Sequence, residues 1–444
     1  MSWALLPGIG AWTTAAARSD VEWFERAQER HRARIEDVWE ETGCQSTALE
    51  PLEELSVEYV YAKRATWFYN QLGREYNPGS NLYLSGRATA RLWSAFAFAA
   101  EPEFSFLQTS NSDGEGDGTT HGAFRELSAS VRTWVADVEV GRIPMWWGPS
   151  RHGSLLLSTN AQPLDVVRVA TPGPVLLPGF LGHLGLIRGE TFLTRLYDDR
   201  AIPRPYLWGA RLSTRVLPWL EVGASRTALF GGKGRAVKWR TFWDVWTAHG
   251  EDKPEGPGDQ RASFDARLVV PWWVQPFELY GELGGEDEAG YLPSKFAHLA
   301  GIYLPRIGPW HALELTVEFA DTEVSGHPGV WYRNASYPDD GYRYEGRIIG
   351  HHVGTDGRDL YAELRVHPFG DETSITAAYN YEARSWPSSV TEKLHQLRLG
   401  LEGRVYRKLW IAGFFERDFW KNYGQVAGAS EGGTAFGLAA WWRF

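Results

Sequence analysis

Cysteine, methionine and lysine are scarce in this sequence of 444 residues, which has one Cys, two Met and only 8 Lys among 45 basic residues. A single cysteine excludes an internal disulfide, a cysteine-based zinc cluster and a Cys-x-x-Cys redox pair. The sequence also lacks any stretch approaching the roughly 18–20 consecutive apolar residues of a membrane helix. Its net charge of −10 argues against a broad nucleic-acid-binding surface.

Aromatic residues and glycine are abundant instead. Trp, Tyr and Phe number 23, 19 and 21 and make up 14% of the chain, which also has 48 glycines. With 43% apolar and 23% charged residues, wholesale disorder is not expected. The basic residues are mostly arginine, whose planar side chain suits bidentate contacts with carboxylates or sugars, although a GC-rich genome would produce the same bias.

The first eighty residues show a helical period. Ser19-Asp20-Val21-Glu22 has the spacing of a helix capping box, and apolar residues recur every three or four positions from Val21 to Val38. A second helical run extends from Leu52 to Leu72. We therefore predict an amphipathic helical segment over residues 18–80. The stretch before it, residues 1–17, fits the remnant of an export signal or a mis-assigned start.

From Asn81 onward the apolar period changes from 3.6 to 2. In residues 313–319, for example, Leu and Val at odd positions alternate with Glu314, Thr316 and Glu318. Segments of about ten residues with one apolar and one polar face are typical of a transmembrane antiparallel β-barrel, with lipid outside and water inside. At about twenty residues per strand with its turns and loops, residues 81–444 provide roughly 16–20 strands.

The C-terminal residues further support the prediction of a transmembrane β-barrel. One apolar face of the last segment ends on a terminal aromatic residue, and it comprises Phe436, Leu438, Ala440, Trp442 and Phe444. Such a face looks like the assembly signal of bacterial outer-membrane barrels, which predicts two partners, the barrel-assembly machinery and outer-membrane lipid. The alternative is the last strand of a soluble sheet.

One predicted loop stands out by its length and aromatic content. Residues 320–358 include Trp331, three tyrosines at 332, 342 and 344, and the pair His351-His352. A structureless loop of this length is usually functional or disordered, and the aromatic density argues against disorder.

Four ordered blocks resemble the capsule-assembly Wzi family of outer-membrane proteins. They are Gly141-Arg-Ile-Pro-Met-Trp-Trp-Gly-Pro149 with Gly153-Ser-Leu155, Leu220–Arg226 with Gly231–Arg235 and Thr241–Asp244, Gly285–Ser294, and Asp339–Tyr342 with Gly354–Gly357. The resemblance covers roughly Leu82 to Phe444. It implies an outer-membrane barrel of about 18 strands with a small periplasmic helical bundle. It also implies a non-enzymatic surface lectin, without cofactor or metal, that binds exported capsular polysaccharide and organises its attachment to the cell.

Within these blocks, two sets of side chains are candidates for polysaccharide binding. Trp146 and Trp147 have flat faces suited to pyranose rings, but they equally suit the aromatic girdle at the bilayer interface. Arg226 and Arg235 would offer donors to acidic sugars, or would pair with inward Glu and Asp across the lumen.

Acidic and tyrosine side chains complete the candidate site. Glu286, Asp287 and Glu288 would accept hydrogen bonds from sugar hydroxyls or bind a cation, or would be partners of the arginines. Tyr332, Tyr342 and Tyr344 are the best candidates for direct stacking on the glycan, with packing inside the loop as the alternative.

Other motifs are weak. Gly231-Gly-Lys-Gly lacks the Ser or Thr of a phosphate loop, and His351-His352 with Asp356 lacks a fixed metal-ligand spacing. Two rival functions therefore remain beside the lectin. One is an outer-membrane channel or porin for saccharides, and the other is a hydrolase that would use Glu286 or Asp287.

Overall fold

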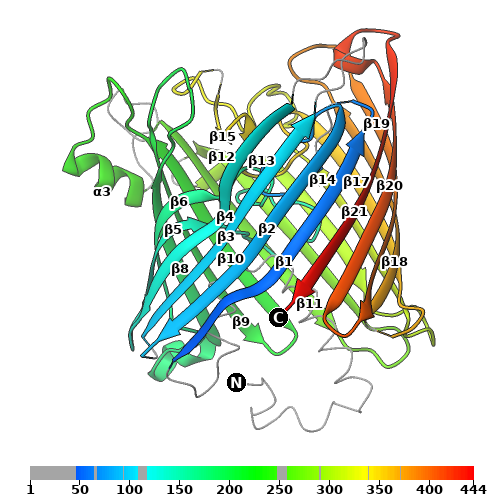
Figure 1. Ribbon diagram of the computed structural model, residues 1–444. Coiled ribbons are helices and arrows are strands. Elements are labelled where there is room, and N and C mark those ends of the chain that lie inside the picture. The colour runs from blue at the N-terminus through cyan, green and yellow to red at the C-terminus, as the bar shows by residue number, and fades with distance from the viewer. Residues whose placement is uncertain are drawn as a thin grey trace.

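The computed structural model describes residues 47–64, 68–93, 95–108, 118–247, 258–289, 292–338, 340–370 and 372–444. These residues form one closed antiparallel β-barrel whose wall has eighteen strands (Figure 1). The wall strands are β1 (Ala48–Ala62), β2 (Gly79–Leu92), β3 (Phe96–Gln108), β4 (Gly118–Arg132), β5 (Asp137–Ile143), β6 (Leu164–Ala170), β8 (Leu186–Arg195), β9 (Tyr206–Leu217), β10 (Leu220–Phe230), β11 (Asp259–Val270), β12 (Phe277–Ala289), β13 (Leu292–Leu304), β14 (Leu313–Asp321), β17 (Gly357–Val366), β18 (Thr373–Arg384), β19 (Glu392–Tyr406), β20 (Leu409–Lys421) and β21 (Ser430–Arg443).

Pairing between the first and last wall strands closes the barrel. β1 is antiparallel to both β2 and β21, and its register with β21 places Tyr59 opposite Leu438. Closure leaves no free strand edge, which a lipid environment requires because backbone groups there have no water to bond.

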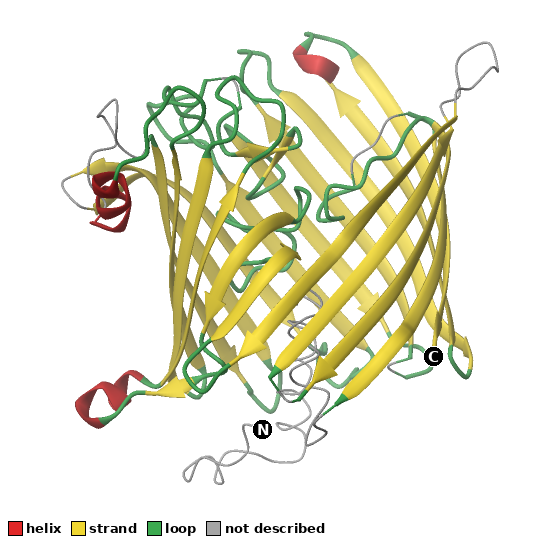
Figure 2. Ribbon diagram, turned by 60° about the vertical axis from the view of Figure 1, so that its left-hand side comes forward, coloured by secondary structure: helices red, strands yellow, loops and turns green. Residues whose placement is uncertain are grey.

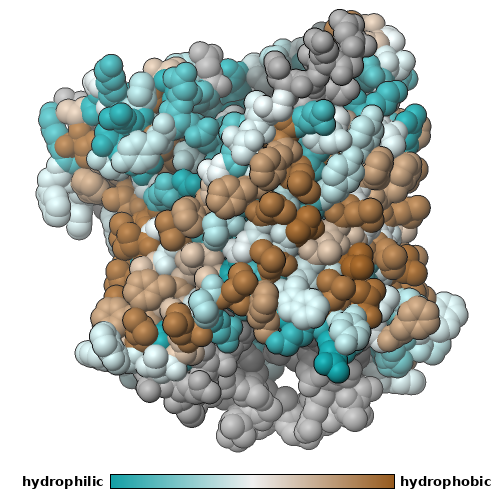
Figure 3. Space-filling model, in the orientation of Figure 1, coloured by the Kyte–Doolittle hydropathy of each residue, from teal (hydrophilic) through white to brown (hydrophobic). Residues whose placement is uncertain are grey.

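The alternation predicted from the sequence sorts side chains between lipid and lumen. On β14 the carboxylates of Glu314 and Glu318 are buried inside the barrel, whereas Phe319 is exposed outside. The outer surface accordingly carries a band of apolar residues around the middle of the wall (Figure 3). The lipid-facing set includes the predicted C-terminal residues Phe436, Leu438, Trp442 and Phe444, all of which are exposed.

The two rims differ, as is usual for such barrels. Most turns at the end where the C-terminus lies are short, although the connection from β6 to β8 (residues 171–185) also lies there, and the longest connections, such as residues 144–163 and 322–356, lie at the opposite end (Figure 1). The short segments of the fold are β7 (Val175–Leu176), η3 (Gly179–Leu184), α3 (Trp239–Thr247), β15 (Arg343–Tyr344), β16 (Arg347–Ile348) and η4 (Tyr423–Gln425).

Helix α3 packs against the outside of the barrel at the long-loop rim (Figure 1). Val245 is buried against Ala228 and Phe230 of β10, while Trp239 and Trp243 remain exposed. Tryptophans in this position match the aromatic belt at a membrane–water interface. No helix among the described residues is long and apolar enough to cross a membrane.

The helix predicted over Leu52–Leu72 is wrong, because Ala48–Ala62 form strand β1. Leu52 and Leu55 point outward, while Glu54 and Glu58 point into the lumen and pair with arginines. The barrel therefore begins at Ala48 and not at Asn81. The predicted helix after Ser19 and the predicted signal remnant, residues 1–17, lie outside the described residues.

Candidate functional site

Three connections of the long-loop rim turn into the barrel and pack on one another. They are loop A (residues 63–78, described except for 65–67), loop B (144–163) and loop C (322–356). Figure 2 shows loop segments crossing the interior between the walls. Residues of loops B and C share one buried apolar cluster, which includes Leu155, Trp331 and Tyr332. Packed protein therefore occupies much of the lumen at this level.

Carboxylates of the wall hold loop B in place. Glu318 of β14 accepts the backbone N–H groups of Arg151, His152 and Gly153, the closest contacts being 2.8 Å. Glu282 of β12 accepts the hydroxyl of Ser150 at 2.6 Å and the N–H of Leu155 at 2.8 Å. These bonds satisfy a buried irregular backbone that has no ladder of its own.

Loop C packs on loop B through hydrogen bonds as well as apolar contacts. The N–H of Ser158 donates to the carbonyl of Ile349 at 2.9 Å, and the hydroxyl of Tyr332 donates to the carbonyl of Leu155 at 2.6 Å. Loop A joins the same assembly, because the N–H of Leu72 donates to the carbonyl of Thr159 at 2.9 Å. The three loops thus form one interior layer.

The predicted role of the tyrosines in stacking on a glycan is wrong, because the rings are covered by protein. Tyr332 and Tyr342 are 1% exposed and Tyr344 is 6% exposed. Trp147 is also buried and packs on Phe192 with ring centroids 5.4 Å apart, while Trp146 is partly buried. Neither the surface stacking nor the bilayer girdle predicted for Trp147 fits, and these aromatic side chains stabilise the interior layer instead.

Within the acidic block, the carboxylate of Glu286 pairs with an arginine. Glu286 accepts from Arg261 at 2.9 Å and from the N–H of Tyr332 at 2.9 Å. This arginine partner, Arg261, was not singled out in the sequence. The backbone of Asp287 and Glu288 continues β12, and their side chains lie outside the described part of the structure.

The two predicted arginines lie apart from each other. Arg226 is on the outward face of β10 and bonds Gln260, so it does not project into the lumen. Arg235 donates to the carbonyl of Ser336 at 2.5 Å and stacks over the ring of Tyr337 at 4.7 Å.

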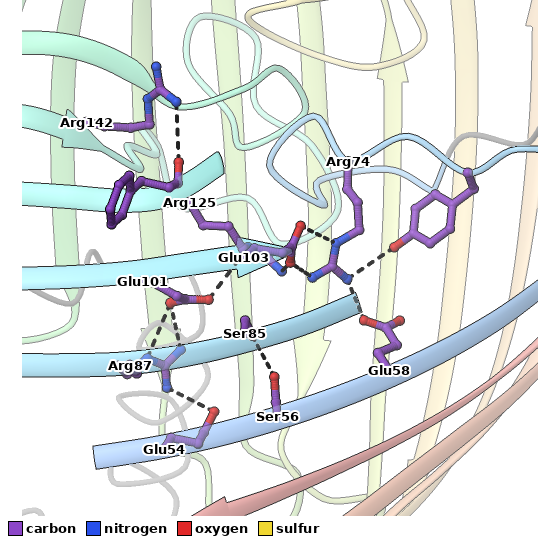
Figure 4. A network of polar contacts seen from close by, with 12 residues as sticks. Glu54, Ser56, Glu58, Arg74, Ser85, Arg87, Glu101, Glu103, Arg125 and Arg142 are labelled. Atoms are coloured by element: carbon purple, nitrogen blue, oxygen red, sulfur yellow. Dashed lines mark hydrogen bonds and ion pairs between the residues drawn. The ribbon is translucent and has the colours of Figure 1, made fainter. Parts of the chain in front are cut away.

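Elsewhere on the wall, charged ladders line the lumen as predicted (Figure 4). Arg74 of loop A lies between Glu58 and Glu103, and it pairs with both. Arg87 bridges Glu101 at 3.2 Å in the same way. These pairs neutralise charges that would otherwise be costly to bury.

A cavity of about 610 Å³ lies between loop C and the wall, and it is lined by none of the predicted binding residues whose side chains the structure describes. Arg64, Arg384 and Trp420 come from the long-loop ends of β1, β18 and β20, so the cavity lies toward that rim. Its size is within the usual range for a ligand pocket, about 300–1,000 Å³. The main polar and aromatic lining residues are Arg64, Tyr69, Arg333, Arg343, Arg347, His352, Arg384, Trp386, Gln396, Asp418 and Trp420.

Arginine and tryptophan alternate in this cavity. The guanidinium of Arg64 lies 5.0 Å from the ring of Trp420, and that of Arg333 lies 4.5 Å from the ring of Trp386. Both tryptophans are only partly buried, so part of each ring surface faces open space. Such surfaces suit the flat apolar face of a sugar ring.

Positive charge in the cavity is crowded. Within the described residues no carboxylate lies within ion-pair distance of Arg64, Arg333 or Arg343. Burial, with the charges of Arg333 and Arg384, lowers the pKa of Arg343 from its usual value. Burial lowers the pKa of Arg347 to about 10. A bound anion would relieve this repulsion, so the cavity is electrostatically suited to a negatively charged ligand.

The sequence contained only a weak signal for this cavity. Arg333, Arg343 and Arg347 alternate with aromatic residues in loop C, but the remaining walls come from positions as distant as Arg64 and Trp420. Only closure of the barrel brings those residues together.

A closed antiparallel barrel with an apolar outer band, a charged interior and long loops at one rim defines a β-barrel protein of the bacterial outer membrane. The chain belongs to the family of the capsule assembly protein Wzi, whose model matches residues 56–434.

Individual relatives agree with this assignment. An uncharacterized 55.8 kDa protein in the cps region of Klebsiella pneumoniae is 32% identical over 178 residues, which are 39% of this chain and 35% of that protein. The alignment thus spans about a third of the relative's length.

Solved structures show the fold. Wzi of Escherichia coli, described as a carbohydrate-binding β-barrel of the outer membrane involved in group 1 capsule assembly, has a TM-score of 0.69 at 21% identity. The match covers 88% of this chain and 84% of that one. OccK1 (OpdK) of Pseudomonas aeruginosa follows with a TM-score of 0.53 at 11% identity, covering 88% and 97%.

Proposed function

We propose that this protein is an outer-membrane lectin that binds an exported acidic polysaccharide in the arginine–tryptophan cavity and holds it at the cell surface during capsule assembly. One observation carries the proposal: Arg64, Arg333 and Arg343 line a cavity toward the long-loop rim without a carboxylate partner among the described residues. The family assignment and the carbohydrate binding described for Wzi of E. coli support it.

The chemistry of the cavity fits sugar acids. Guanidinium groups bind carboxylates through paired N–H donors, and the ring of Trp386 or Trp420 offers a flat face to a pyranose. A single site of this kind binds weakly. A repeating polymer meeting many barrels gains strength from avidity, so attachment does not require a tight single site.

A saccharide channel is the second candidate, and the interior layer disfavours it. Loops A, B and C pack across the lumen with buried side chains such as Leu155 and Trp331. The likeness to OccK1 concerns the fold alone. The proposal includes no catalytic step, since Glu286, named for a hydrolase, is buried against Arg261 and Tyr332.

Calorimetric titration of the detergent-purified barrel with a uronic-acid oligosaccharide tests the proposal, with a neutral oligosaccharide of equal length as the reference ligand. We expect binding of the acidic ligand that weakens with salt. Losing one charge-assisted contact of about 1.5–3 kcal/mol in Arg333→Gln or Arg343→Gln should weaken binding by at least about tenfold.

Arg240→Gln is the matched control, because Arg240 lies on α3 at the same rim, is 78% exposed and does not line the cavity. Equal binding of the neutral and acidic ligands, or equal loss in the control, would contradict the assigned site. If neither ligand binds, the lectin proposal fails.

A further inference from the structure

A second cluster of polar side chains lies in the interior layer beside the cavity. His152 of loop B and His352 of loop C both direct Nε2 toward the carboxylate of Asp359 on β17. His352 Nε2 is 3.2 Å from Oδ2, and His152 Nε2 is 3.5 Å from Oδ1. One ligand atom from each of the three residues fits within a span of 4.8 Å. The weak motif noted in the sequence combined His351 and His352 with Asp356. Of these three residues, only His352 belongs to the cluster.

Both imidazoles are held in position by their neighbours. The ring of His352 stacks on Tyr69 with centroids 3.9 Å apart, and the ring of His152 stacks on Tyr361 at 3.8 Å. The backbone of His152 is fixed as well, because its carbonyl accepts from Asn70 at 2.6 Å and its N–H donates to Glu318. A set of ligands that is fixed before the ion arrives pays little ordering cost on binding.

The hydrogen bonds within the cluster are incomplete. His152 Nε2 and Asp359 Oδ1 are buried, and neither has a hydrogen-bond partner among the described residues, although they face each other. Buried polar atoms are normally satisfied, so this pair points to a missing cation that would contact both atoms from beside the line that joins them.

We infer that His152, His352 and Asp359 form a binding site for a divalent transition-metal ion of the zinc type. With metal–ligand distances of about 2.0–2.2 Å, the ligand atoms of a tetrahedral site lie about 3.4 Å apart. Each histidine Nε2 lies close to this distance from one oxygen of the same carboxylate, at 3.2 Å from Oδ2 and 3.5 Å from Oδ1. Two imidazoles and one carboxylate suit zinc, cobalt and iron, and disfavour calcium and magnesium, which prefer oxygen ligands.

The surroundings supply both a fourth ligand and a route for the ion. Glu382 Oε1 of β18 lies 3.7 Å from His352 Nε2, so it takes the fourth position directly or through water. His352 lines the 610 Å³ cavity and His152 lines a second cavity of about 570 Å³, so the cluster is reached from both. A bound ion would fasten loops B and C to the wall at one point.

The inference is independent of the lectin proposal, because its test uses metal alone. Tag-free barrel is stripped with a chelator and titrated with Co²⁺ while the visible d–d absorption is recorded, followed by competition with Zn²⁺. We expect one Co²⁺ per chain with the spectrum of a four-coordinate nitrogen–oxygen site. Zn²⁺ should displace it and raise the unfolding temperature relative to chelator-treated protein.

His152→Gln and His352→Gln should each weaken Co²⁺ binding by at least about 100-fold, since even the loss of an outer-shell partner costs about 10–100-fold. Asp359→Asn, which keeps the side-chain shape, gives the same result if a histidine variant fails to fold. His351→Gln is the matched control, being equally buried beside His352 but absent from the cluster.

Three results would overturn the inference. The first is the absence of a Co²⁺ spectrum in folded wild-type barrel. The second is unchanged binding in both His152→Gln and Asp359→Asn. The third is an equal loss in His351→Gln.

Discussion

The carboxylate of Glu318 on β14 accepts the backbone N–H of Gly153 in loop B at 2.8 Å, across 165 residues of sequence. The same carboxylate also accepts the N–H groups of Arg151 and His152 and the hydroxyl of Tyr280. The side chain of Glu318 therefore orients the middle of loop B. This loop contains the metal-ligand candidate His152 and a large part of the interior core.

Replacing Glu318 by Gln should loosen loop B without preventing barrel formation. The charge-assisted bonds weaken, and the amide nitrogen would point a donor at backbone donors, so we expect a loss of about 1.5–3 kcal/mol. Trypsin cleavage after Arg151, which loop packing now hinders, should become faster. Thermal unfolding in detergent and limited proteolysis measure the two effects.

Glu323→Gln serves as the control, because Glu323 forms an exposed ion pair with Arg358 that contributes about 0–1 kcal/mol. If Glu318→Gln were as stable and as protease-resistant as this control, loop B would not depend on the carboxylate.

Gly153 should not tolerate a methyl group. A Cβ at this position would lie 2.3 Å from the ring of His351, which is itself buried. Overpacking of this kind costs about 1–3 kcal/mol, so Gly153→Ala should lower the unfolding temperature measured by circular dichroism. Gly118→Ala is the matched control, since no atom of the described residues lies within 4 Å of a Cβ at that position, and equal melting of the two variants would refute the close packing.

The barrel wall was predictable because its signal is local. A period of two along each strand indicates which side chains face lipid and which face the lumen. On β14, for example, Phe319 faces outward and Glu318 faces inward. β1 was missed because Leu52, Leu55 and Tyr59 also satisfy a helical period. Its identity as a strand depends on pairing with β2 on one side and with β21, nearly four hundred residues away in the sequence, on the other.

The site was predictable only in part, because a loop sequence does not state whether the loop faces water or the lumen. Tyr332 and Tyr342 carry the composition of a sugar-binding loop, yet loop C folds inward and buries them. The metal-ligand candidates likewise come from three separate segments, which only the folded barrel brings together.

The interior layer predicts that the barrel conducts ions poorly. Single-channel recordings in planar bilayers should show little conductance for the wild-type protein, because loops A, B and C pack across the lumen. Replacing residues 323–355 by a short glycine–serine linker should open a large pore. Replacing the exposed residues 426–428 by glycine is the control and should leave conductance low. High conductance of the wild-type protein would favour the saccharide-channel function over the lectin function.

The terminal aromatic residue should matter for assembly of the barrel more than for its final stability. Phe444 follows β21, faces outward, and donates its N–H to the carbonyl of Glu53 at 2.8 Å. The N–H bond survives in Phe444→Ser, whereas the lipid-facing ring that resembles the assembly signal is lost. We expect several-fold less folded barrel in outer-membrane fractions, measured by the faster migration of unheated barrels on gels.

Phe369→Ser is the control variant. It removes another exposed phenylalanine, at a turn of the short-turn rim, and should assemble normally. Equal yields of folded barrel from both variants would mean that the ring of Phe444 is not required for assembly.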